Sequence, residues 1–339
     1  MTCALVTFAV MFLIERVERL KAVLIILTVI PLSILTGCEA GGGKLLTVDF
    51  QPGQTLRYKF VSSRDVEINW SFPAQGTRKA GNKADKLHES MEMVVAYSPL
   101  EVDSYGLTTI KATCESVKVE RKQRGGTADA VESLAGKSFT ITVSPTGKME
   151  DSSQLNELIR EAGKKVFRPV GNEGKIKNPD MIGDFIATQW FLWDAIASIE
   201  KPLNGVSVGR RWTSKLSVPT PMVSRLARDV TYTLEEIRQS EKGELAVIKS
   251  SYSLDGSAPS SWPIPYTGVF QMSGTFGFFA RYRYLDLKGE GQELFNIDAG
   301  RTEQYSQQYQ LNAGASIPFG IEAGAEIKIK QNLTMQLLE

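Results

Sequence analysis

Few residues of this chain have types and spacings that could carry out chemistry. The 339-residue sequence has one histidine, His88, which lies in a polar stretch beside Glu89. A single histidine gives poor support for serine–histidine catalysis or a histidine metal site, so we interpret it as a solvated side chain. Glu235 and Glu236 are adjacent carboxylates, but neighbouring residues of a strand point to opposite faces, which separates them. No phosphate-binding glycine loop precedes a helix. The sequence therefore predicts no catalytic residue, no metal site and no cofactor.

Cys38 stands at the end of an apolar run, where its neighbours point to a covalent modification. Three basic residues precede the run, which extends over residues 22–35 and leads into Leu35-Thr36-Gly37-Cys38. A basic flank, a short apolar core and small residues are the parts of a signal peptide. The four-residue pattern resembles the lipobox of bacterial lipoproteins. The resemblance implies that residues 1–37 are removed and that the Cys38 thiol receives a diacylglyceryl group.

The apolar run is too short for a comfortable transmembrane helix. As a helix, residues 22–35 would span about 21 Å, whereas the apolar core of a bilayer is about 30 Å thick. Another apolar stretch, residues 3–14, precedes the basic flank, which is the wrong order for a signal peptide. Two explanations stay open: translation starts at Met11, or the two stretches form a hairpin of short membrane spans.

Acylation of Cys38 would keep the protein on a membrane surface. Two or more acyl chains on one residue anchor a protein stably, whereas a single chain binds reversibly. Residues 38–43 contain three consecutive glycines and would form a flexible tether. Glu39 bears on sorting between two membranes in some bacteria, so inner and outer membrane both stay open. We therefore expect an extracytoplasmic, lipid-anchored protein whose first partner is a bacterial membrane.

Charge and cysteine content exclude several classes of function. Residues 1–37 hold three of the 39 basic and two of the 38 acidic side chains, which leaves 36 of each in the mature chain. A formal net charge of zero argues against a nucleic-acid partner, which requires a basic face. Cys3 would be lost with the signal peptide and Cys38 blocked by lipid, so Cys114 is left without a disulfide partner. We expect Cys114 to be a small buried side chain.

The dominant hydrophobic period of the body, residues 44–339, is two. Alternation predicts strands within 56–60, 66–72, 91–96, 107–119, 139–143 and 326–338, and the polar residues 73–86 and 121–137 predict loops. Helical spacing predicts two helices, about 152–167 and 179–199. We therefore predict a mainly β (α+β) fold, an antiparallel curved sheet or half-barrel covered by two helices.

The body shows signs of an internal repeat. Residues 97–117 are similar to 232–254, and 139–147 to 295–300, which indicates two similar β-meander halves, 44–177 and 178–339. Unrelated hairpins with a glycine at the bend would look as much alike, so a true duplication stays open.

Two groups of apolar side chains are candidates for binding an apolar ligand. The 179–199 helix has more apolar surface than a helix on one sheet needs, and residues 275–287 are rich in aromatics. The candidate residues are Phe185, Trp190, Trp193, Phe276, Phe278 and Tyr282. Ordinary core packing is the simpler interpretation of the aromatic residues in 275–287.

The signal peptide, the β-rich body and the segments 289–300 and 327–338 are together similar to a family of bacterial envelope lipoproteins of unknown function. This resemblance implies no activity, and only Cys38 can be carried over as a functional residue. We expect a non-enzymatic envelope lipoprotein with a binding or structural role. The alternatives are a carrier or sensor of a lipid-like ligand, held between the sheet and the 179–199 helix, and a hydrolase built on carboxylates.

Overall fold

The structure, a computed structural model, separates residues 1–43 from a second compact unit, residues 44–339, which holds all the elements below. The described residues are 43–72, 81–121, 130–145, 149–164, 167–170, 173–176, 205–217, 227–255, 270–272, 281–316 and 324–338. The predicted signal peptide and Cys38 lie outside them. Within the described part, no helix is long and apolar enough to cross a bilayer.

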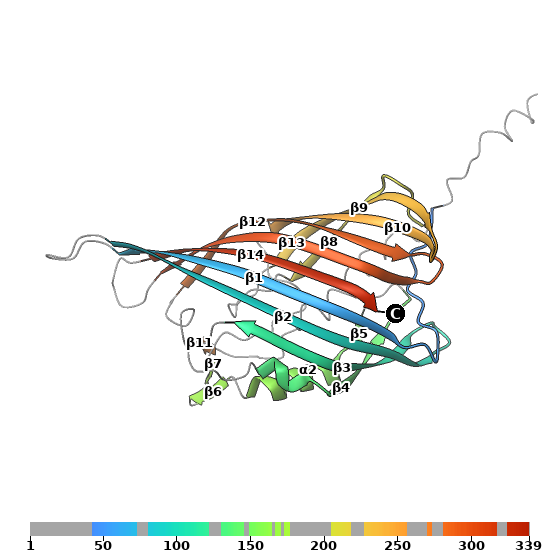
Figure 1. Ribbon diagram of the computed structural model, residues 1–339, viewed down its shortest axis with the longest axis horizontal. Coiled ribbons are helices and arrows are strands. Elements are labelled where there is room, and N and C mark those ends of the chain that lie inside the picture. Colours follow the sequence, from blue (N-terminus) through green and yellow to red (C-terminus); the bar gives the residue numbers. More distant parts are fainter. Residues whose placement is uncertain are drawn as a thin grey trace, which may run out of the picture. The chain divides into compact units, whose positions relative to one another are not determined.

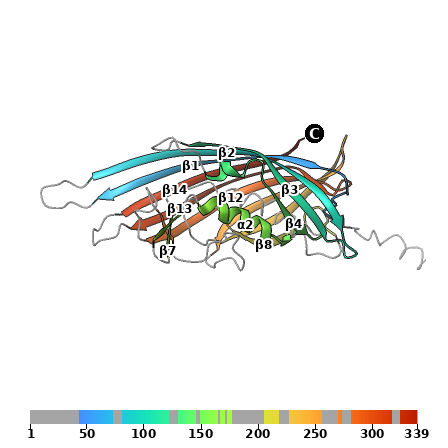
Figure 2. The same cartoon turned by 90° about the horizontal axis from the view of Figure 1, so that it is seen from below.

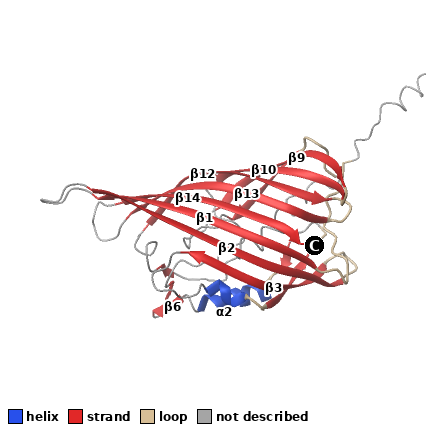
Figure 3. Cartoon of the chain, viewed as in Figure 1, coloured by secondary structure: helices blue, strands red, loops and turns tan. Residues whose placement is uncertain are grey.

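Eleven strands form one antiparallel sheet, which confirms the prediction of a mainly β, antiparallel fold (Figures 1 and 3). In spatial order the strands are β5 (Met149–Asp151), β4 (Ser138–Val143), β3 (Thr108–Arg121), β2 (Gly81–Val102), β1 (Leu56–Phe72), β14 (Gly324–Leu338), β13 (Arg301–Ser316), β12 (Arg281–Asn296), β10 (Gly243–Asp255), β9 (Ala227–Ser240) and β8 (Arg211–Ser217). Their side chains alternate between buried and exposed along the strands, as the period of two predicts.

The first and last strands pair in the middle of this sheet. β1 and β14 run antiparallel, with Val66 opposite Ile329, and they lie side by side in blue and red in Figure 1. β1 to β5 form a meander that extends to one edge of the sheet, and β8, β9, β10, β12, β13 and β14 form another that extends to the opposite edge. The similar segments 97–117 and 232–254 fall on β2–β3 and β9–β10, but β2 lies next to the central strand β1, whereas β9 lies next to the edge strand β8. The duplication itself stays a prediction.

The expectation of two helices covering the sheet is not supported. α2 (Ser153–Lys164) confirms the first helix, and the Asp151 carboxylate accepts a hydrogen bond from the Ser153 amide at its start. The helix packs against β4 and the 3-10 helix η1 (Ala130–Leu134), near one edge of the sheet (Figure 2). It ends earlier than predicted, because Phe167 begins β6. The other predicted helix, 179–199, lies outside the described residues.

A small sheet and one longer hairpin complete the fold. β6 (Phe167–Val170) and β7 (Glu173–Ile176) pair antiparallel, and β11 (Phe270–Met272) joins β7 in parallel. The predicted loop at 73–86 is wrong over residues 81–86, which belong to β2 and pair with β1. These residues are polar and have low intrinsic strand propensity, so it is the pairing with β1 that holds them extended.

The two faces of the eleven-stranded sheet differ in chemistry. The outer face is polar and carries ion pairs between neighbouring strands, such as Lys59 with Glu92 at 2.9 Å. The inner face is apolar, and its buried side chains form two clusters. An antiparallel sheet with one solvated face is expected to have this alternation.

The larger cluster, here the layered cluster, includes side chains from outside the sheet. Leu46 and Val48 of the segment before β1, Val131 of η1, and Leu155 and Leu158 of α2 pack on its strand residues. Cys114 belongs to this cluster and is fully buried, which confirms the prediction for it.

The smaller cluster, here the sheet cluster, consists of Val66, Ile68, Leu287, Tyr309, Leu311, Ala313, Ala325, Ile327 and Ile329. All of these residues lie on β1, β12, β13 and β14. Among the residues that the structure describes, no side chain of a second layer belongs to the cluster.

Candidate functional site

An open cavity of about 870 Å³ lies at the end of the sheet cluster. Trp70, Ala315 and Ala325 line it, and all three belong to the cluster or pack against it. Lys83, Arg283 and Glu326 also line it and give it charged groups. Small-molecule sites commonly have volumes of about 300–1,000 Å³ and combine apolar walls with a few polar groups. The cavity therefore has the size and composition of a ligand site that opens on apolar surface.

Trp70 is held in place at this cavity by two contacts. Its ring stacks on Phe72, with centroids 6.0 Å apart and planes 8° apart. Its indole N–H donates a hydrogen bond of 2.8 Å to Asp85 Oδ2 on β2. Hydrogen bonds from Lys83 and from Trp70 lower the pKa of Asp85, so this carboxylate stays ionised as an acceptor. A fixed aromatic side chain at the mouth of a cavity offers apolar contact at little entropic cost.

A band of buried polar side chains crosses the inner face where the two clusters meet, and its three tyrosines also belong to the clusters. It lies in two adjacent rows that run across β2, β1, β14, β13, β12 and β10. We call it the polar band and define it as Ser62, Arg64, Glu89, Ser250, Tyr252, Tyr305, Gln307, Tyr309 and Gln331, each at most 7% exposed. Tyr305 lies one row beyond the others and is included because its hydroxyl bonds to band residues.

Hydrogen bonds connect the band from strand to strand. Gln331 Nε2 donates to Ser62 Oγ at 2.6 Å, and Tyr309 donates to Gln331 Oε1 at 3.5 Å. On the β10 side, the Tyr252 hydroxyl shares hydrogen bonds of 2.7 Å with the Ser250 and Tyr305 hydroxyls. At the β2 end, Arg64 pairs with Glu89. The band therefore contains two groups of neutral, hydrogen-bonded side chains and one ion pair at its β2 end.

Two glycines of β12 make room for the band. Gly289 lies opposite Tyr309 and Tyr252, and Gly291 lies opposite Gln307 and Ser250. A Cβ at residue 291 would collide with the Tyr252 hydroxyl and would lie 2.6 Å from Ser250 Oγ. Because neither glycine carries a side chain, the Tyr252 hydroxyl can reach across β12 to Tyr305 on β13.

Glu293 is a buried carboxyl beside the band, opposite Tyr305 on β13. Thr302 Oγ1 donates a hydrogen bond of 2.6 Å to Glu293 Oε1, whereas Oε2 is buried without a hydrogen-bond partner. Burial raises the pKa of Glu293 to about 7, although the Thr302 hydrogen bond acts in the opposite direction. The carboxyl is thus poised between its neutral and ionised forms near neutral pH.

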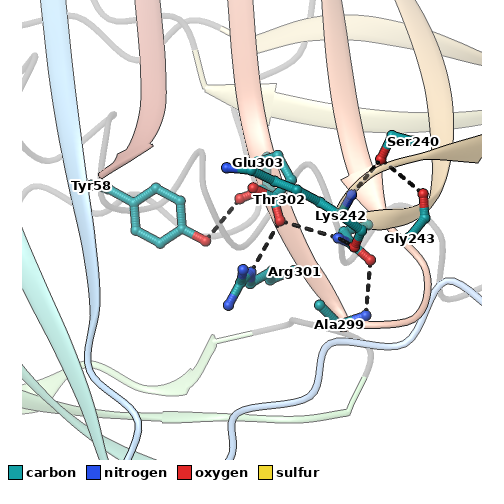
Figure 4. A network of polar contacts seen from close by, with 9 residues as sticks. Tyr58, Ser240, Lys242, Gly243, Ala299, Arg301, Thr302 and Glu303 are labelled. Atoms are coloured by element: carbon teal, nitrogen blue, oxygen red, sulfur yellow. Dashed lines mark hydrogen bonds and ion pairs between the residues drawn. The ribbon is translucent and has the colours of Figure 1, made fainter. Parts of the chain in front are cut away.

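A second polar network fixes the backbone near Glu293 (Figure 4). The Tyr58 hydroxyl donates to the Thr302 carbonyl at 2.9 Å, and burial raises the pKa of Tyr58, which keeps it protonated. Asn296 Nδ2 donates to the Lys242 carbonyl at 2.8 Å and to Glu303 Oε1 at 3.2 Å, and Arg301 Nε donates to the same Glu303 oxygen. These contacts tie the β9–β10 turn to the β12–β13 turn, so Thr302 is held where it meets Glu293.

The outer face has a cavity of another kind. It measures about 770 Å³ and is lined by charged residues that include Asp65, Lys328 and Lys330. His88 lines it too, exposed as predicted, with Nδ1 2.7 Å from Asp65 Oδ1. Within the described ranges, no group of three or more His, Cys, Asp or Glu residues could hold a metal ion. Glu235 and Glu236 are both exposed, and each pairs with a cation, Lys249 and Arg238 respectively.

The predicted ligand-binding residues lie almost entirely outside the described part of the chain. Phe185, Trp190, Trp193, Phe276 and Phe278 are all outside it, as is Cys38. Tyr282 lies on β12 opposite Ala315, a residue of the cavity, but its side chain is not described. These assignments stay predictions.

Trp70 as a cavity residue and the polar band were not predicted from the sequence. Ser62 and Arg64 share the parity of Phe60 and Val66, and this parity placed them on the buried face. A charged residue at a buried position of an otherwise alternating strand was the available signal.

No protein-family model matches the chain, and no curated protein matches it significantly. Among solved structures, the chain is similar to one described as lipid–protein interactions in lipovitellin, with 12% identity and a TM-score of 0.39, over 86% of this chain and 26% of that one. It is also similar to the Salmonella injectisome secretin InvG, with 8% identity and a TM-score of 0.13 over 84% of this chain and 60% of that one. OccAB4 of Acinetobacter baumannii has 9% identity and a TM-score of 0.16 over 85% of this chain and 99% of its own. The chain spans about a quarter of the lipovitellin chain. At these TM-scores, no similarity carries an argument about function.

Proposed function

We propose that this protein is a lipid-anchored, extracytoplasmic binding protein that holds an apolar, lipid-like ligand against the inner face of its sheet, without catalysis. The observation that carries the proposal is the cavity of about 870 Å³ that opens on the sheet cluster. The anchor follows from the resemblance of Leu35-Thr36-Gly37-Cys38 to a lipobox.

The composition of the sheet cluster supports an apolar occupant. A sheet buries an apolar face against a second layer, and η1 and α2 supply residues of that layer for the layered cluster. The sheet cluster has no such partner among the described residues, and the cavity lies at its end. At the cavity Trp70 is only partly buried, and an apolar group that replaces water there gains about 25 cal/mol per Å² of apolar surface.

The length of the sheet cluster also fits a lipid tail. Along β1 the cluster begins at Val66, and Trp70 packs on it at the cavity. At about 3.3 Å per residue, these four steps cover about 13 Å. One leaflet of acyl chains is about 15 Å deep, half of the apolar core of a bilayer. The described cluster therefore matches one acyl chain in length.

The other two hypotheses have less support in the described residues. A carboxylate hydrolase requires two facing acidic side chains, and Glu235 and Glu236 instead pair with cations on the exposed surface. A binding role towards another envelope component requires a distinctive outer surface, and the outer face has alternating charges that largely pair with each other.

Lipid analysis of the purified full chain tests the proposal. The protein is extracted from membranes, exchanged into a detergent that keeps it folded, and its retained small molecules are counted by native mass spectrometry. We expect about one apolar molecule per chain. Ala325→Phe, which fills the cavity, should lower the retained amount severalfold, whereas Thr334→Phe, on the exposed face of the same strand, should not. A wild-type protein without any retained apolar molecule, and with no uptake of added lipid, would sink the proposal.

A further inference from the structure

Exposed apolar side chains gather at one end of the eleven-stranded sheet. Seven large apolar side chains in the described part of the chain are exposed, and five of them belong to segments that meet at this end. We call these five the apolar rim: Leu45, Leu100, Val102, Tyr105 and Val208. Tyr105, in the β2–β3 turn, is 85% exposed. Single exposed apolar residues are normal on a protein surface, but a group of them marks an interaction site.

The segment before β1 connects the two sides of this end. Lys44 exchanges backbone hydrogen bonds with Val206, which precedes β8, and the Val48 amide donates to the Pro145 carbonyl after β4. The four steps from Lys44 to Val48 cover about 13 Å when extended. Pro145 lies against the β2–β3 turn, since a Cβ on Gly106 would be 2.9 Å from Pro145 Cγ. This segment, blue in Figure 1, therefore runs along the end that carries both parts of the rim.

The backbone that presents Tyr105 is fixed by its turn. The Asp103 carboxylate accepts hydrogen bonds of 2.8 Å from the amides of Tyr105 and Leu107. Gly106 follows with a φ of 81°, a conformation that other residues rarely adopt. A tyrosine on a fixed turn contacts a partner at small entropic cost, and its ring and hydroxyl suit the boundary between an apolar and an aqueous phase.

We propose that the apolar rim docks on the surface of the membrane that holds the anchor. This inference rests on the anchor of the proposed function and adds a second contact with the same bilayer. Residues 38–43 connect Cys38 to Lys44, and six residue steps span at most about 21 Å. Because the chain enters the body at Lys44, the anchor keeps the rim, rather than the opposite end of the sheet, close to the bilayer.

The charges at this end favour apolar contact over attraction to anionic lipids. Lys44 pairs with Glu244 at 2.7 Å, and the exposed cation Arg210 is matched by the exposed acidic residues Glu101 and Asp103. Attraction to an anionic surface requires a cluster of cations and is screened by salt. A bilayer of zwitterionic lipid is therefore a sufficient surface, and the contact should be independent of salt.

Docking at the rim holds the ligand cavity away from the anchoring membrane. β1 runs from Leu56 at the rim end to Trp70 at the cavity, and these 14 steps cover about 46 Å at 3.3 Å per residue. Phe72, two residues further along β1, is 41% exposed and gives the opposite end an apolar side chain for comparison. The two ends therefore have opposite expectations for a probe of bilayer contact.

Spin labelling of the acylated protein in phosphatidylcholine vesicles tests the inference. Cys114→Ala removes the thiol that signal-peptide removal and acylation leave free. A nitroxide is then attached singly to Tyr105→Cys, Val208→Cys or Phe72→Cys. Its collision rate is measured with oxygen, which concentrates in the bilayer, and with a nickel chelate, which stays in water. We expect a severalfold higher oxygen-to-nickel ratio at residues 105 and 208 than at residue 72, at low and at high salt.

Matched variants assign the contact to the rim. Tyr105→Ser combined with Leu100→Ser should lower the docked-to-undocked ratio reported by the label at residue 208 about tenfold, which corresponds to about 1.4 kcal/mol. Phe72→Ser is the control and should leave this ratio unchanged. All three replaced side chains are exposed, so thermal unfolding of the variants should stay close to that of the labelled parent protein.

The outcomes separate this inference from the proposed function. If the acylated protein floats with the vesicles but the label at residue 105 has the same ratio as the label at residue 72, the anchor stands and the rim inference is overturned. A label at residue 105 that neither reagent reaches would indicate a protein or a second copy on the rim, which also overturns it. If mass spectrometry shows no acyl chain on Cys38, the anchor fails and the rim inference falls with it.

Discussion

Arg64 on β1 and Glu89 on β2 face each other across the sheet and form an ion pair of 2.6 Å in which both side chains are buried. Both Arg64 Nε and Arg64 Nη2 donate to the same Glu89 oxygen, Oε2, at 2.9 and 2.6 Å. The pair closes the β2 end of the polar band. Its geometry makes each charge depend on the other, because neither is solvated by bulk water.

Removing one partner of this pair should destabilise the protein strongly. Glu89→Leu leaves a buried guanidinium without its carboxylate, and we expect a loss of about 3–5 kcal/mol of unfolding free energy. The double substitution Arg64→Met with Glu89→Leu removes both charges and should recover most of this loss. Urea unfolding of the wild type, the two single variants and the double variant measures the coupling free energy between the two charges. Single variants that each cost less than 1 kcal/mol would contradict a buried pair.

Glu293 should make stability fall as pH rises towards neutrality. The pKa of Glu293 is about 7 in the folded state and 4.5 for an ordinary glutamate, so between these values the folded protein binds more protons than the unfolded chain. Stability is then full below pH 4.5 and is lost as pH rises to about 7, by about 3 kcal/mol at 1.36 kcal/mol per pKa unit.

Glu293→Gln tests this dependence because it removes the titrating group and keeps the shape. The difference in unfolding free energy between the variant and the wild type, measured in urea from pH 4.5 to pH 8, should grow with pH in favour of the variant. A difference that is independent of pH would show that Glu293 does not titrate in this range.

Gly291→Ala should disturb the polar band, whereas Gly314→Ala should not. A Cβ at residue 291 would meet the Tyr252 hydroxyl and Ser250 Oγ, but at residue 314 the nearest atom is 4.0 Å away. We expect Gly291→Ala to cost about 1–3 kcal/mol by overpacking, and Gly314→Ala to change stability by less than about 0.5 kcal/mol. Adding Tyr252→Phe should relieve part of the Gly291→Ala cost. Equal thermal shifts for the two alanine variants would argue against the arrangement of Tyr252 over β12.

Cys38→Ala should release the protein from the membrane. If the thiol carries the acyl chains, the variant loses the anchor, and fractionation should move it from the membrane pellet to the soluble fraction. Cys114→Ala is the control, since Cys114 is buried in the layered cluster and burial raises its pKa to about 12. Metabolic labelling with a fatty acid should mark the wild type and Cys114→Ala only. An unlabelled wild-type protein would remove the basis for the predicted location.

Much of the fold could be predicted from the sequence because β1 and β14 have clean alternation. Leu56, Tyr58 and Phe60 share one face, and the residues between them are polar, so the period of two identified the strand directly. The strand at residues 81–86 could not be predicted in this way, because both of its faces are polar and it has no hydrophobic alternation. Their extended form depends on pairing with residues 67–72 of β1, which a local sequence pattern does not reveal.

The candidate site was harder to predict, because its residues come together only when the strands pair in their observed registers. Arg64, Gln331 and Tyr252 are distant in sequence and become one band through registers that no local pattern encodes. The aromatic residues around Phe276 drew attention by their density, whereas the single Trp70 did not. A ligand site built on a sheet face gives a weak sequence signal for this reason.

The pairing of β1 with β14 has a consequence for how the chain matures. Because β1 and β14 are neighbours at the centre of the sheet although they lie far apart in the sequence, the middle can close only after β14 has been synthesised, and contacts of such long sequence separation form slowly. Until then two half-built meanders would each expose an unpaired edge, which is a template for aggregation. A chain that stops before residue 324 would therefore lack the central strand β14, whereas the loss of an edge strand would leave the centre of the sheet paired.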